Sequence, residues 1–159
     1  MAVQGKDAID ILEKSLDVKF NLSTRFSHQV INVFDDEAFV ARTGYTGEDG
    51  VEILIPKESG IKLWDILLKN GVAPCGLGCR DTLRLEAGMH LYGSEMNTTT
   101  TPYEASLGWI INSKKSYIGQ EVLEQQKEKG IDKKLVAITL TKRNIARHDY
   151  PVMNLSLIH

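Results

Sequence analysis

A glycine-rich loop at residues 43–50 carries the side chains with the clearest chemical potential. It reads Thr-Gly-Tyr-Thr-Gly-Glu-Asp-Gly and is followed at once by Val51, Glu52 and Ile53. Glycines let the backbone turn sharply and let a flat ligand come close, while Tyr45 offers a ring face for stacking. The Glu52 carboxylate can accept two hydrogen bonds from the N–H and amino groups on one edge of a pterin-like ring. A plain turn before an apolar strand explains the same residues, so both interpretations stay open.

The composition argues against several classes of partner. The chain has 159 residues and a formal net charge of −2, and its lysine-rich stretches at 114–115 and 127–134 show no basic stripe with interleaved aromatic residues. It has no apolar run of membrane-spanning length, and residues 1–7 lack the pattern of a secretory signal. We therefore expect an intracellular protein that binds neither nucleic acid nor membrane.

The two cysteines do not predict a metal site. Cys75 and Cys79 lie four residues apart, with no second cysteine pair and no histidine cluster near them. A structural zinc ion needs four such ligands, so half of the set would be missing. The sequence predicts no bound metal.

The elements that must position the loop are predicted by hydrophobic periodicity. Apolar residues at helical spacing predict an amphipathic helix over residues 5–17. Two β-prone runs, 30–34 and 38–42, are joined by the acidic turn 35–37, and a third strand follows over 51–55. The loop should therefore connect the second and third strands.

Two further helices follow the third strand. Residues 58–70 predict a helix that ends at an Asn-Gly pair, and residues 79–87 predict a helix that ends at Gly88. The stretch 72–75 between them contains a proline and is expected to be a short edge strand. This order of elements predicts an α+β fold with a mostly antiparallel sheet.

The second half of the chain differs in composition from the first and begins with an irregular polar segment. This segment leads to a short helical start at residues 102–105, and residues 109–112 predict a strand. An exposed helix is expected over 119–129, closed by Gly130. The run 135–140, Leu-Val-Ala-Ile-Thr-Leu, predicts a buried strand that needs partners.

Long motifs in the correct order carry a family resemblance. They occupy residues 42–53, 76–88, 91–93, 99–102 with Glu104 and Trp109, 118–121 and 147–151. Together they resemble the glycine cleavage system T protein, the tetrahydrofolate-dependent aminomethyltransferase. The similarity extends from Ala2 to about Val152.

The resemblance implies an activity and two ligand-contacting residues. In that family an aminomethyl group on the lipoyl arm of H protein passes to tetrahydrofolate, with release of ammonia. H protein and tetrahydrofolate, the latter as co-substrate, are the implied partners. The family's folate-contacting glutamate and arginine fall on Glu52 and Arg80, and Tyr45 is expected to line the same pocket. From physics alone Arg80 could instead form an ion pair with Asp81 or Glu86.

Other side chains have more than one interpretation. Arg84 and Glu86 are expected to support the fold, and Trp109 could be either core or pocket wall. Tyr92 could serve either purpose. Histidine can serve as an acid or base near neutral pH, but His90 and histidine 148 have no acid or nucleophile arranged beside them in the sequence, so neither receives a role.

The chain resembles only an internal part of the family's sequence. Family members are more than twice as long, so the N-terminal portion and most of the C-terminal domain have no counterpart here. The aspartate regarded as essential in the family falls in the missing N-terminal portion, and we assign no catalytic residue. We expect this chain to be inactive alone.

The resemblance also implies three parts within an α+β fold. Residues 1–78 would form the second half of a split ferredoxin-like antiparallel sheet domain. Residues 79–115 would form part of a central folate-binding domain, and 116–159 a linker helix and the start of a C-terminal β-barrel. Such a piece would leave sheet edges and apolar faces uncovered, so self-association is expected.

Two alternatives from other classes stay open. The related folate-binding proteins of iron–sulfur cluster assembly carry a Lys-Gly-Cys-Tyr-x-Gly-Gln-Glu motif, which residues 115–121 resemble without its cysteine. The other alternative is an inactive interaction fragment. The expected compartment is the bacterial cytoplasm or the mitochondrial matrix.

Overall fold

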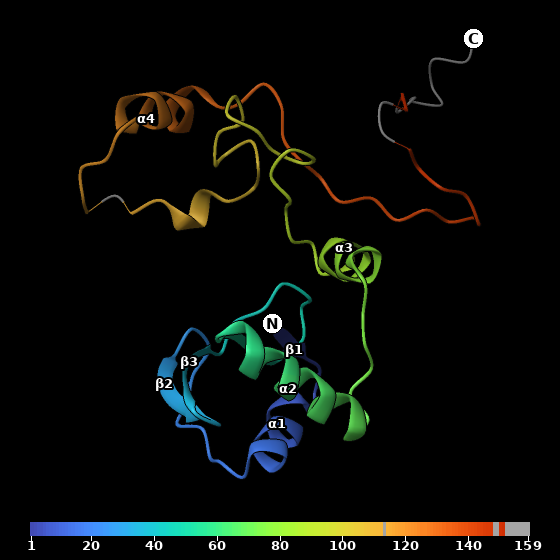
Figure 1. Cartoon of the computed structure of the whole chain (residues 1–159). Coiled ribbons are helices and arrows are strands. Elements are labelled where there is room, and N and C mark those ends of the chain that lie inside the picture. Colours follow the sequence, from blue (N-terminus) through green and yellow to red (C-terminus); the bar gives the residue numbers. More distant parts are fainter. Residues whose placement is uncertain (113, 148–149, 152–159) are drawn as a thin grey trace. The chain divides into compact units, whose positions relative to one another are not determined.

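The chain forms two compact units (Figure 1). The structure is a computed structural model that describes residues 1–112, 114–147 and 150–151. The first unit is Met1–Ser94 and the second begins at Glu95. Each unit is described by itself below.

The first unit is built on an antiparallel sheet of four strands in the order β1–β4–β3–β2. The strands are β1 (Ala2–Gln4), β2 (His28–Val33), β3 (Asp36–Ala41) and β4 (Gly50–Leu54). The strands predicted at 30–34, 38–42 and 51–55 and the antiparallel α+β class are confirmed. Strand β1 was not predicted, and β2 and β3 each begin two residues earlier than expected, so the hairpin turn lies at residues 34–35.

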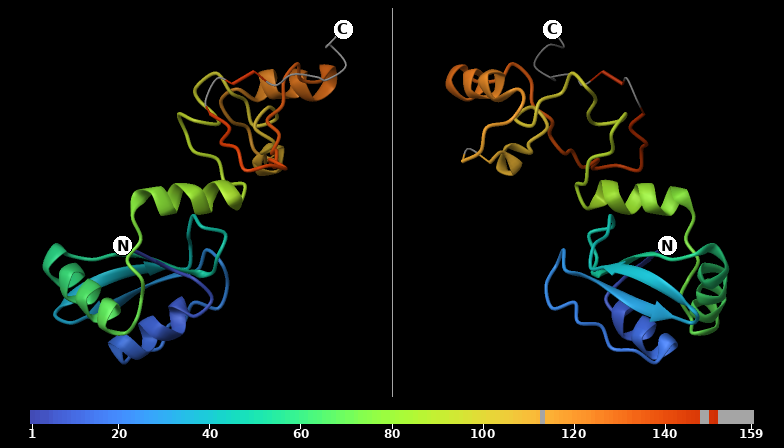
Figure 2. Two further views of the ribbon diagram at one scale, coloured as in Figure 1. Left: turned by 90° about the vertical axis from the view of Figure 1, so that its right-hand side faces the viewer. Right: turned by 60° about the vertical axis from the view of Figure 1, so that its left-hand side comes forward.

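Two amphipathic helices cover one face of this sheet (Figure 2). Helix α1 (Ala8–Leu16) contributes Leu12 and helix α2 (Lys57–Lys69) contributes Leu63 to the core, where both side chains are fully buried. They pack with the inward-facing side chains of the strands, including Val40 and Val51. Burial of these apolar groups is the main force that holds the unit together.

The opposite face of the sheet carries exposed apolar side chains. Val30, Phe39 and Leu54 are paired across β2, β3 and β4 and form one row, with exposed fractions of 59%, 39% and 67%. Glu52 lies two residues before Leu54 on β4, so the alternation of the strand places it on the same face. The open face is therefore where the candidate carboxylate is presented.

Helix α3 (Leu77–Glu86) completes the first unit. The edge strand predicted at residues 72–75 is wrong, because this stretch has no strand structure. The Val72 N–H instead donates to the Leu67 carbonyl at 3.0 Å, which closes the C-terminal end of α2. Pro74 has no N–H to offer a sheet, so the segment runs on as an irregular connection.

The second unit contains one regular α-helix, α4 (Gln120–Lys129), among its described residues. This helix confirms the prediction, and Gly119 and Gly130 flank it with positive φ angles of 87° and 88°. The strand predicted at 109–112 is wrong: Gly108–Ile110 is a single turn of 3-10 helix, η1. The Ile110 N–H donates to the Leu107 carbonyl, which keeps it from pairing with another strand.

The short helical start predicted at residues 102–105 is a hydrogen-bonded turn. The Thr101 N–H donates to the Glu104 carboxylate at 2.8 Å, and the Glu104 N–H donates to the Thr101 hydroxyl at 3.3 Å. The Ala105 N–H closes the turn on the Thr101 carbonyl at 3.0 Å. This reciprocal capping arrangement begins a helix that the chain does not continue.

The predicted buried strand at 135–140 is also wrong. The described residues of this stretch have no strand structure, and Val136, Ile138 and Leu140 are 68%, 66% and 46% exposed. A strand needs hydrogen-bonding partners, and the second unit offers no neighbouring strand in its described part.

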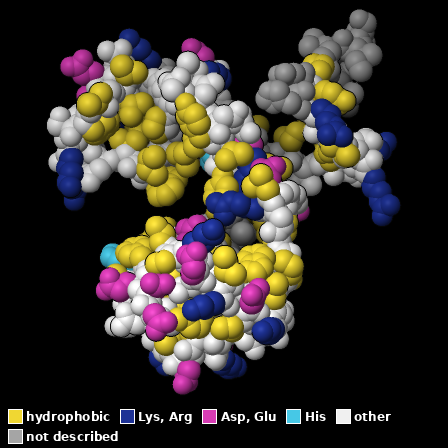
Figure 3. All heavy atoms as spheres, viewed as in Figure 1, with side chains coloured by type: hydrophobic (Ala, Val, Ile, Leu, Met, Phe, Trp, Pro, Cys, Tyr) yellow, Lys and Arg dark blue, Asp and Glu magenta, His cyan; other side chains and the backbone are white. Residues whose placement is uncertain are grey.

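Hydrophobic side chains on the visible surface of each unit are yellow in Figure 3.

No helix in the part of the chain that the structure describes is long and apolar enough to cross a membrane.

The predicted domain boundaries after residues 78 and 115 refer to domains of the family. They do not refer to the two compact units of this chain, and they stay predictions.

Candidate functional site

The glycine-rich loop, residues 43–49 between β3 and β4, takes its shape from two glycines in particular. Gly47 has a φ of 79°, and a Cβ there would lie 2.8 Å from the Ala87 Cβ. Gly50, at the start of β4, has a φ of 155°, and a Cβ there would lie 2.3 Å from the Val3 carbonyl oxygen. A side chain at either position would be strained and would collide, so the loop needs glycine at both.

Gln4 holds the two ends of the loop together from strand β1. Its Nε2 donates to the Thr43 carbonyl at 3.1 Å and to the Val51 carbonyl at 3.0 Å. A Cβ on Gly44 would lie 2.0 Å from Gln4 Oε1, so the missing side chain makes room for the amide. Gln4 thus sets the spacing between the end of β3 and the start of β4.

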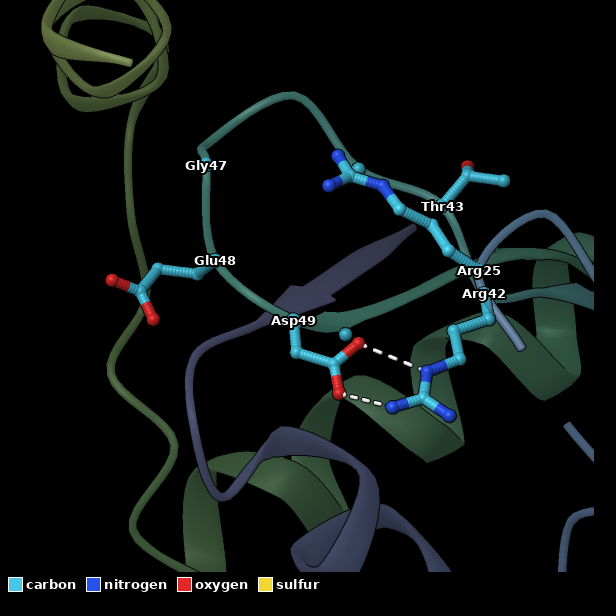
Figure 4. Close-up of a pocket in the computed structure, with 8 residues that line it drawn as sticks. Arg25, Arg42, Thr43, Gly47, Glu48 and Asp49 are labelled. Atoms are coloured by element: carbon cyan, nitrogen blue, oxygen red, sulfur yellow. Dashed lines mark hydrogen bonds and ion pairs between the residues drawn. The ribbon is translucent and has the colours of Figure 1, made fainter. Parts of the chain in front are cut away.

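An ion pair closes the loop on its other side (Figure 4). Arg42 Nε and Nη2 donate to the two oxygens of Asp49 at 3.0 and 2.6 Å, and Nη1 donates to the Leu22 carbonyl at 2.7 Å. The hydrogen bond from Arg42 holds the pKa of the Asp49 carboxyl below its usual range, and the same bond holds the pKa of Arg42 above its own. We call this pair the Arg42–Asp49 clip.

Glu52, on strand β4, is hydrogen-bonded to the first residue of the loop. Its carboxylate accepts a hydrogen bond from the Thr43 hydroxyl, and its side chain is half-buried on β4. Strand pairing places it between Ala2 of β1 and Ala41 of β3, two small residues. A carboxylate offers about four lone-pair positions, so it retains acceptor capacity beyond the bond from Thr43.

Tyr45 and Arg80 are brought together. The Arg80 guanidinium lies over the Tyr45 ring, 5.0 Å from its centroid, and the Tyr45 hydroxyl donates to the His90 carbonyl. One face of the ring proposed for stacking is thus covered by Arg80. Tyr45 is fixed by its hydroxyl and in turn orients the guanidinium through a cation–π contact.

Two cavities flank the loop. A cavity of about 280 Å³ is lined by loop residues, by Arg42 and by Arg25, while the Glu48 side chain points away from the clip (Figure 4). A cavity of about 300 Å³ lies between α2, β1 and α3 and is lined by Arg80 and mainly apolar side chains. Glu52 is not among the described residues that line this second cavity. Arg80 thus lines the second of these cavities, whereas Glu52 is among the described lining residues of neither.

The remaining candidate residues differ in how deeply they are buried. Arg84 is buried, and it donates to Asp81 at 2.8 Å and to the Met89 carbonyl at 3.2 Å, as expected of a residue that supports the fold. Trp109 is 82% exposed, so it is not a core residue of the second unit. Tyr92 is 62% exposed. Histidine 148 lies outside the described residues.

The described residues include no group of three or more His, Cys, Asp or Glu side chains that could hold a metal ion. The three predicted site residues supply one carboxylate (Glu52), one guanidinium (Arg80) and one phenol ring (Tyr45).

Sequence reasoning missed Gln4 and the Arg42–Asp49 clip. Gln4 lies in a strand of only three residues, which has no periodicity to reveal it. The clip has a signal that could have been used: an arginine and an aspartate at the two ends of a glycine-rich loop can reach each other when the loop folds back on itself.

Comparisons with known proteins identify the family of the chain. Residues 1–115 match the family model of the GCVT N-terminal domain. An aminomethyltransferase of Synechococcus sp. (strain CC9311) is 51% identical over 158 residues, and one of Synechocystis sp. is 49% identical over 156 residues. These matches cover 97% of this chain but 43% and 42% of the relatives, so the chain spans less than half of their length.

A solved structure shows the same fold. The crystal structure of glycine cleavage system aminomethyltransferase T from Bartonella henselae superposes with a TM-score of 0.67 and 34% sequence identity, over 80% of this chain and 36% of that one. The family model covers well over half of the chain, and the relatives agree with it. The chain therefore belongs to the aminomethyltransferase family of the glycine cleavage system, the T proteins.

Proposed function

We propose that the protein containing this sequence transfers the aminomethyl group from the lipoyl arm of H protein to tetrahydrofolate and releases ammonia. Family membership supports the class of reaction. The geometric observation that carries the proposal is the loop that fixes both Glu52, through Thr43, and Arg80, through Tyr45. The chain would supply part of the folate-binding surface.

Glu52 would hold the pterin edge of tetrahydrofolate. Its carboxylate is half-buried, it is oriented by the Thr43 hydroxyl, and its neighbours across the sheet are alanines that leave space. A carboxylate accepts paired N–H donors in bidentate fashion, and partial burial strengthens such bonds. Tetrahydrofolate would supply the nucleophilic nitrogens of the reaction, while Glu52 would fix their position.

Arg80 would contact the ligand as a cation held in place by Tyr45. Its guanidinium is stacked on the ring, and its neighbour Asp81 is already bonded to Arg84. Arg80 therefore stays available to a carboxylate or carbonyl of the folate. Tyr45 contributes by supporting Arg80, in addition to any contact of its own with the ligand.

The wider architecture belongs to the same proposal. The sheet of the first unit would be one half of a split ferredoxin-like domain, and the stretch after residue 116 would lead into a C-terminal β-barrel. The relatives' greater length supports a catalytic aspartate outside this sequence. The chain alone would then be inactive. The relatives named above are bacterial, which favours the bacterial cytoplasm over the mitochondrial matrix.

A chimera tests the proposal. The matched segment of the Synechococcus sp. (strain CC9311) aminomethyltransferase is replaced by this chain, and ammonia release is measured with aminomethylated H protein and tetrahydrofolate. The chimera is expected to show folate-dependent release that Glu52→Gln abolishes and that Glu48→Gln, which removes the same charge from the loop, leaves unchanged. Equal activity in the two variants would contradict the role of Glu52. Release by the chain alone would contradict its inactivity.

A further inference from the structure

The only two cysteines of the chain lie together at the beginning of helix α3. Both are free and exposed, and both line the cavity of about 300 Å³ that also contains Arg80. Cys75 lies just before Gly76, the residue at the N-terminal cap of α3, and Cys79 lies in the first turn of the helix. The connection is short, so the two sulfur atoms face the same space.

The two thiols have different partners. The Cys75 thiol donates to the Ala73 carbonyl, with 3.6 Å between sulfur and oxygen. The Cys79 thiol bonds in turn to the Cys75 sulfur, and this bond raises the pKa of Cys79. Cys79 therefore holds its proton more firmly than an ordinary thiol does, because of the Cys75 side chain beside it.

We propose that Cys75 and Cys79 are a reversible disulfide-forming pair, a modification site at the start of α3. The reaction partner is a low-molecular-weight disulfide such as oxidised glutathione. The Cys75 thiolate attacks one sulfur of that disulfide, which breaks its S–S bond and releases one glutathione thiolate. Cys79 then loses its proton to solvent and attacks the Cys75 sulfur of the mixed disulfide, releasing the second thiolate. The two cysteines lose two electrons, and the glutathione disulfide gains them.

The local backbone allows this closure. Gly76 and Gly78, both between the cysteines, have no atoms within 4 Å of an added Cβ, so the segment lies in open space. Both sulfurs are accessible to a dissolved reagent. The bond would tie the residue before the helix cap to the first turn, one residue from Arg80. The inference rests on these two thiols and does not depend on folate binding.

The test exposes the chain to mixtures of oxidised and reduced glutathione, followed by acid quenching, alkylation and peptide mass spectrometry. The expected product is a peptide that contains both cysteines, has lost two hydrogens and carries no alkyl group, and that reverts with dithiothreitol. Cys75→Ser and Cys79→Ser serve as matched controls and are expected to carry a single glutathione that stays in place. Wild-type chain that collects glutathione on both cysteines, or that forms disulfides between chains, would overturn the proposal.

Phenylarsine oxide gives a second readout that needs no oxidant. It condenses with two neighbouring thiols, and one water molecule leaves. The wild-type chain should retain one arsenical per chain, at least about tenfold more tightly than either single serine variant, because the second bond forms within one molecule. Equal retention by the wild-type and single-serine chains would show that the thiols do not act as a pair.

Discussion

At the scale of single residues, the Arg42–Asp49 clip sets the shape of the loop. All three guanidinium nitrogens of Arg42 donate hydrogen bonds, two to the Asp49 carboxylate and one to the Leu22 carbonyl. A planar fork that meets a carboxylate with two bonds fixes an orientation that a lysine cannot reproduce. The clip and the Gln4 amide together hold the loop from two sides, so Tyr45 and Thr43 are placed by residues that need not touch a ligand.

The clip predicts a specific dependence on pH. Because Arg42 lowers the pKa of Asp49, the pair stabilises the folded state above the unfolded Asp pKa of about 3.9, and this stabilisation is lost as the pH falls through the lower, folded value. Asp49→Asn should reduce the free energy of unfolding near neutral pH and reduce it less, or not at all, in acid. Urea unfolding of both chains at about pH 7 and about pH 3 measures this difference.

Asp65→Asn is the matched control, since Asp65 is an exposed aspartate of α2. It should leave the pH dependence of unfolding close to that of the wild type. An identical loss of stability for Asp49→Asn at both pH values would show that the clip contributes no titratable stabilisation.

At the scale of elements, the pairing of β1 with β4 depends on Gly50. The Val3 carbonyl approaches so closely that a Cβ on Gly50 would lie 2.3 Å from it. Strand β1 is only three residues long, and it carries Gln4, so any shift of β1 also moves the amide that holds the loop.

Two glycine substitutions should therefore have opposite effects. Gly50→Ala should lower the free energy of unfolding by about 1–3 kcal/mol from backbone strain, and further because of the collision with Val3. Gly78→Ala, in α3, meets no atom within 4 Å and should raise it by about 0.5–1 kcal/mol, as alanine favours a helix. Denaturant unfolding of the two variants decides this; equal effects would mean that the close approach at Gly50 relaxes without cost.

The amphipathic helices, which bury one row of apolar side chains, could be predicted from the sequence. Strands that exist only through hydrogen bonds to a neighbouring strand could not. In α1 and α2 the apolar residues recur at helical spacing, and this spacing indicates the buried side of each helix, which includes Leu12 and Leu63. The run 135–140 has strand composition, but composition does not supply the neighbouring strand that it lacks in the described structure. Strand β1 shows the reverse case, because three residues become a strand only through their bonds to β4.

The same contrast holds for the candidate site. Glu52, Tyr45 and Arg80 stand in long motifs, and the structure shows that Tyr45 and Arg80 touch. The sequence offered Asp81 as a partner for Arg80, but burial of Arg84 directs Asp81 to Arg84 instead. Which of two arginines takes a shared carboxylate depends on the direction each side chain leaves the helix, and residue type does not determine it.

At the scale of the whole molecule, apolar surface is left open in both units. The row of Val30, Phe39 and Leu54 covers three strands of the first unit, and Trp109 and Ile118 are exposed in the second. Large exposed apolar patches promote association in water. The relatives are more than twice as long as this chain, so such surfaces have further residues available to cover them in those proteins.

The isolated chain is therefore expected to self-associate. Light scattering at several concentrations should show a mass that rises with concentration, and Leu54→Lys should reduce it. Ile61→Lys, which adds the same charge to the exposed side of α2, should have a smaller effect. A compact monomer at all concentrations, with one cooperative unfolding transition, would contradict this expectation.

Calorimetric titration of tetrahydrofolate into the chimera and its Glu52→Gln variant tests the central claim most directly. Glutamine keeps the size of the side chain but replaces one acceptor oxygen with a donor, so a donor on the pterin edge would face a donor on the protein. Affinity should fall by about 2–4 kcal/mol, roughly 30-fold to 1,000-fold, while Glu48→Gln should bind as the parent chimera does. Unchanged folate affinity in a folded Glu52→Gln protein would contradict the account, and the glycine-rich loop would then be a structural turn.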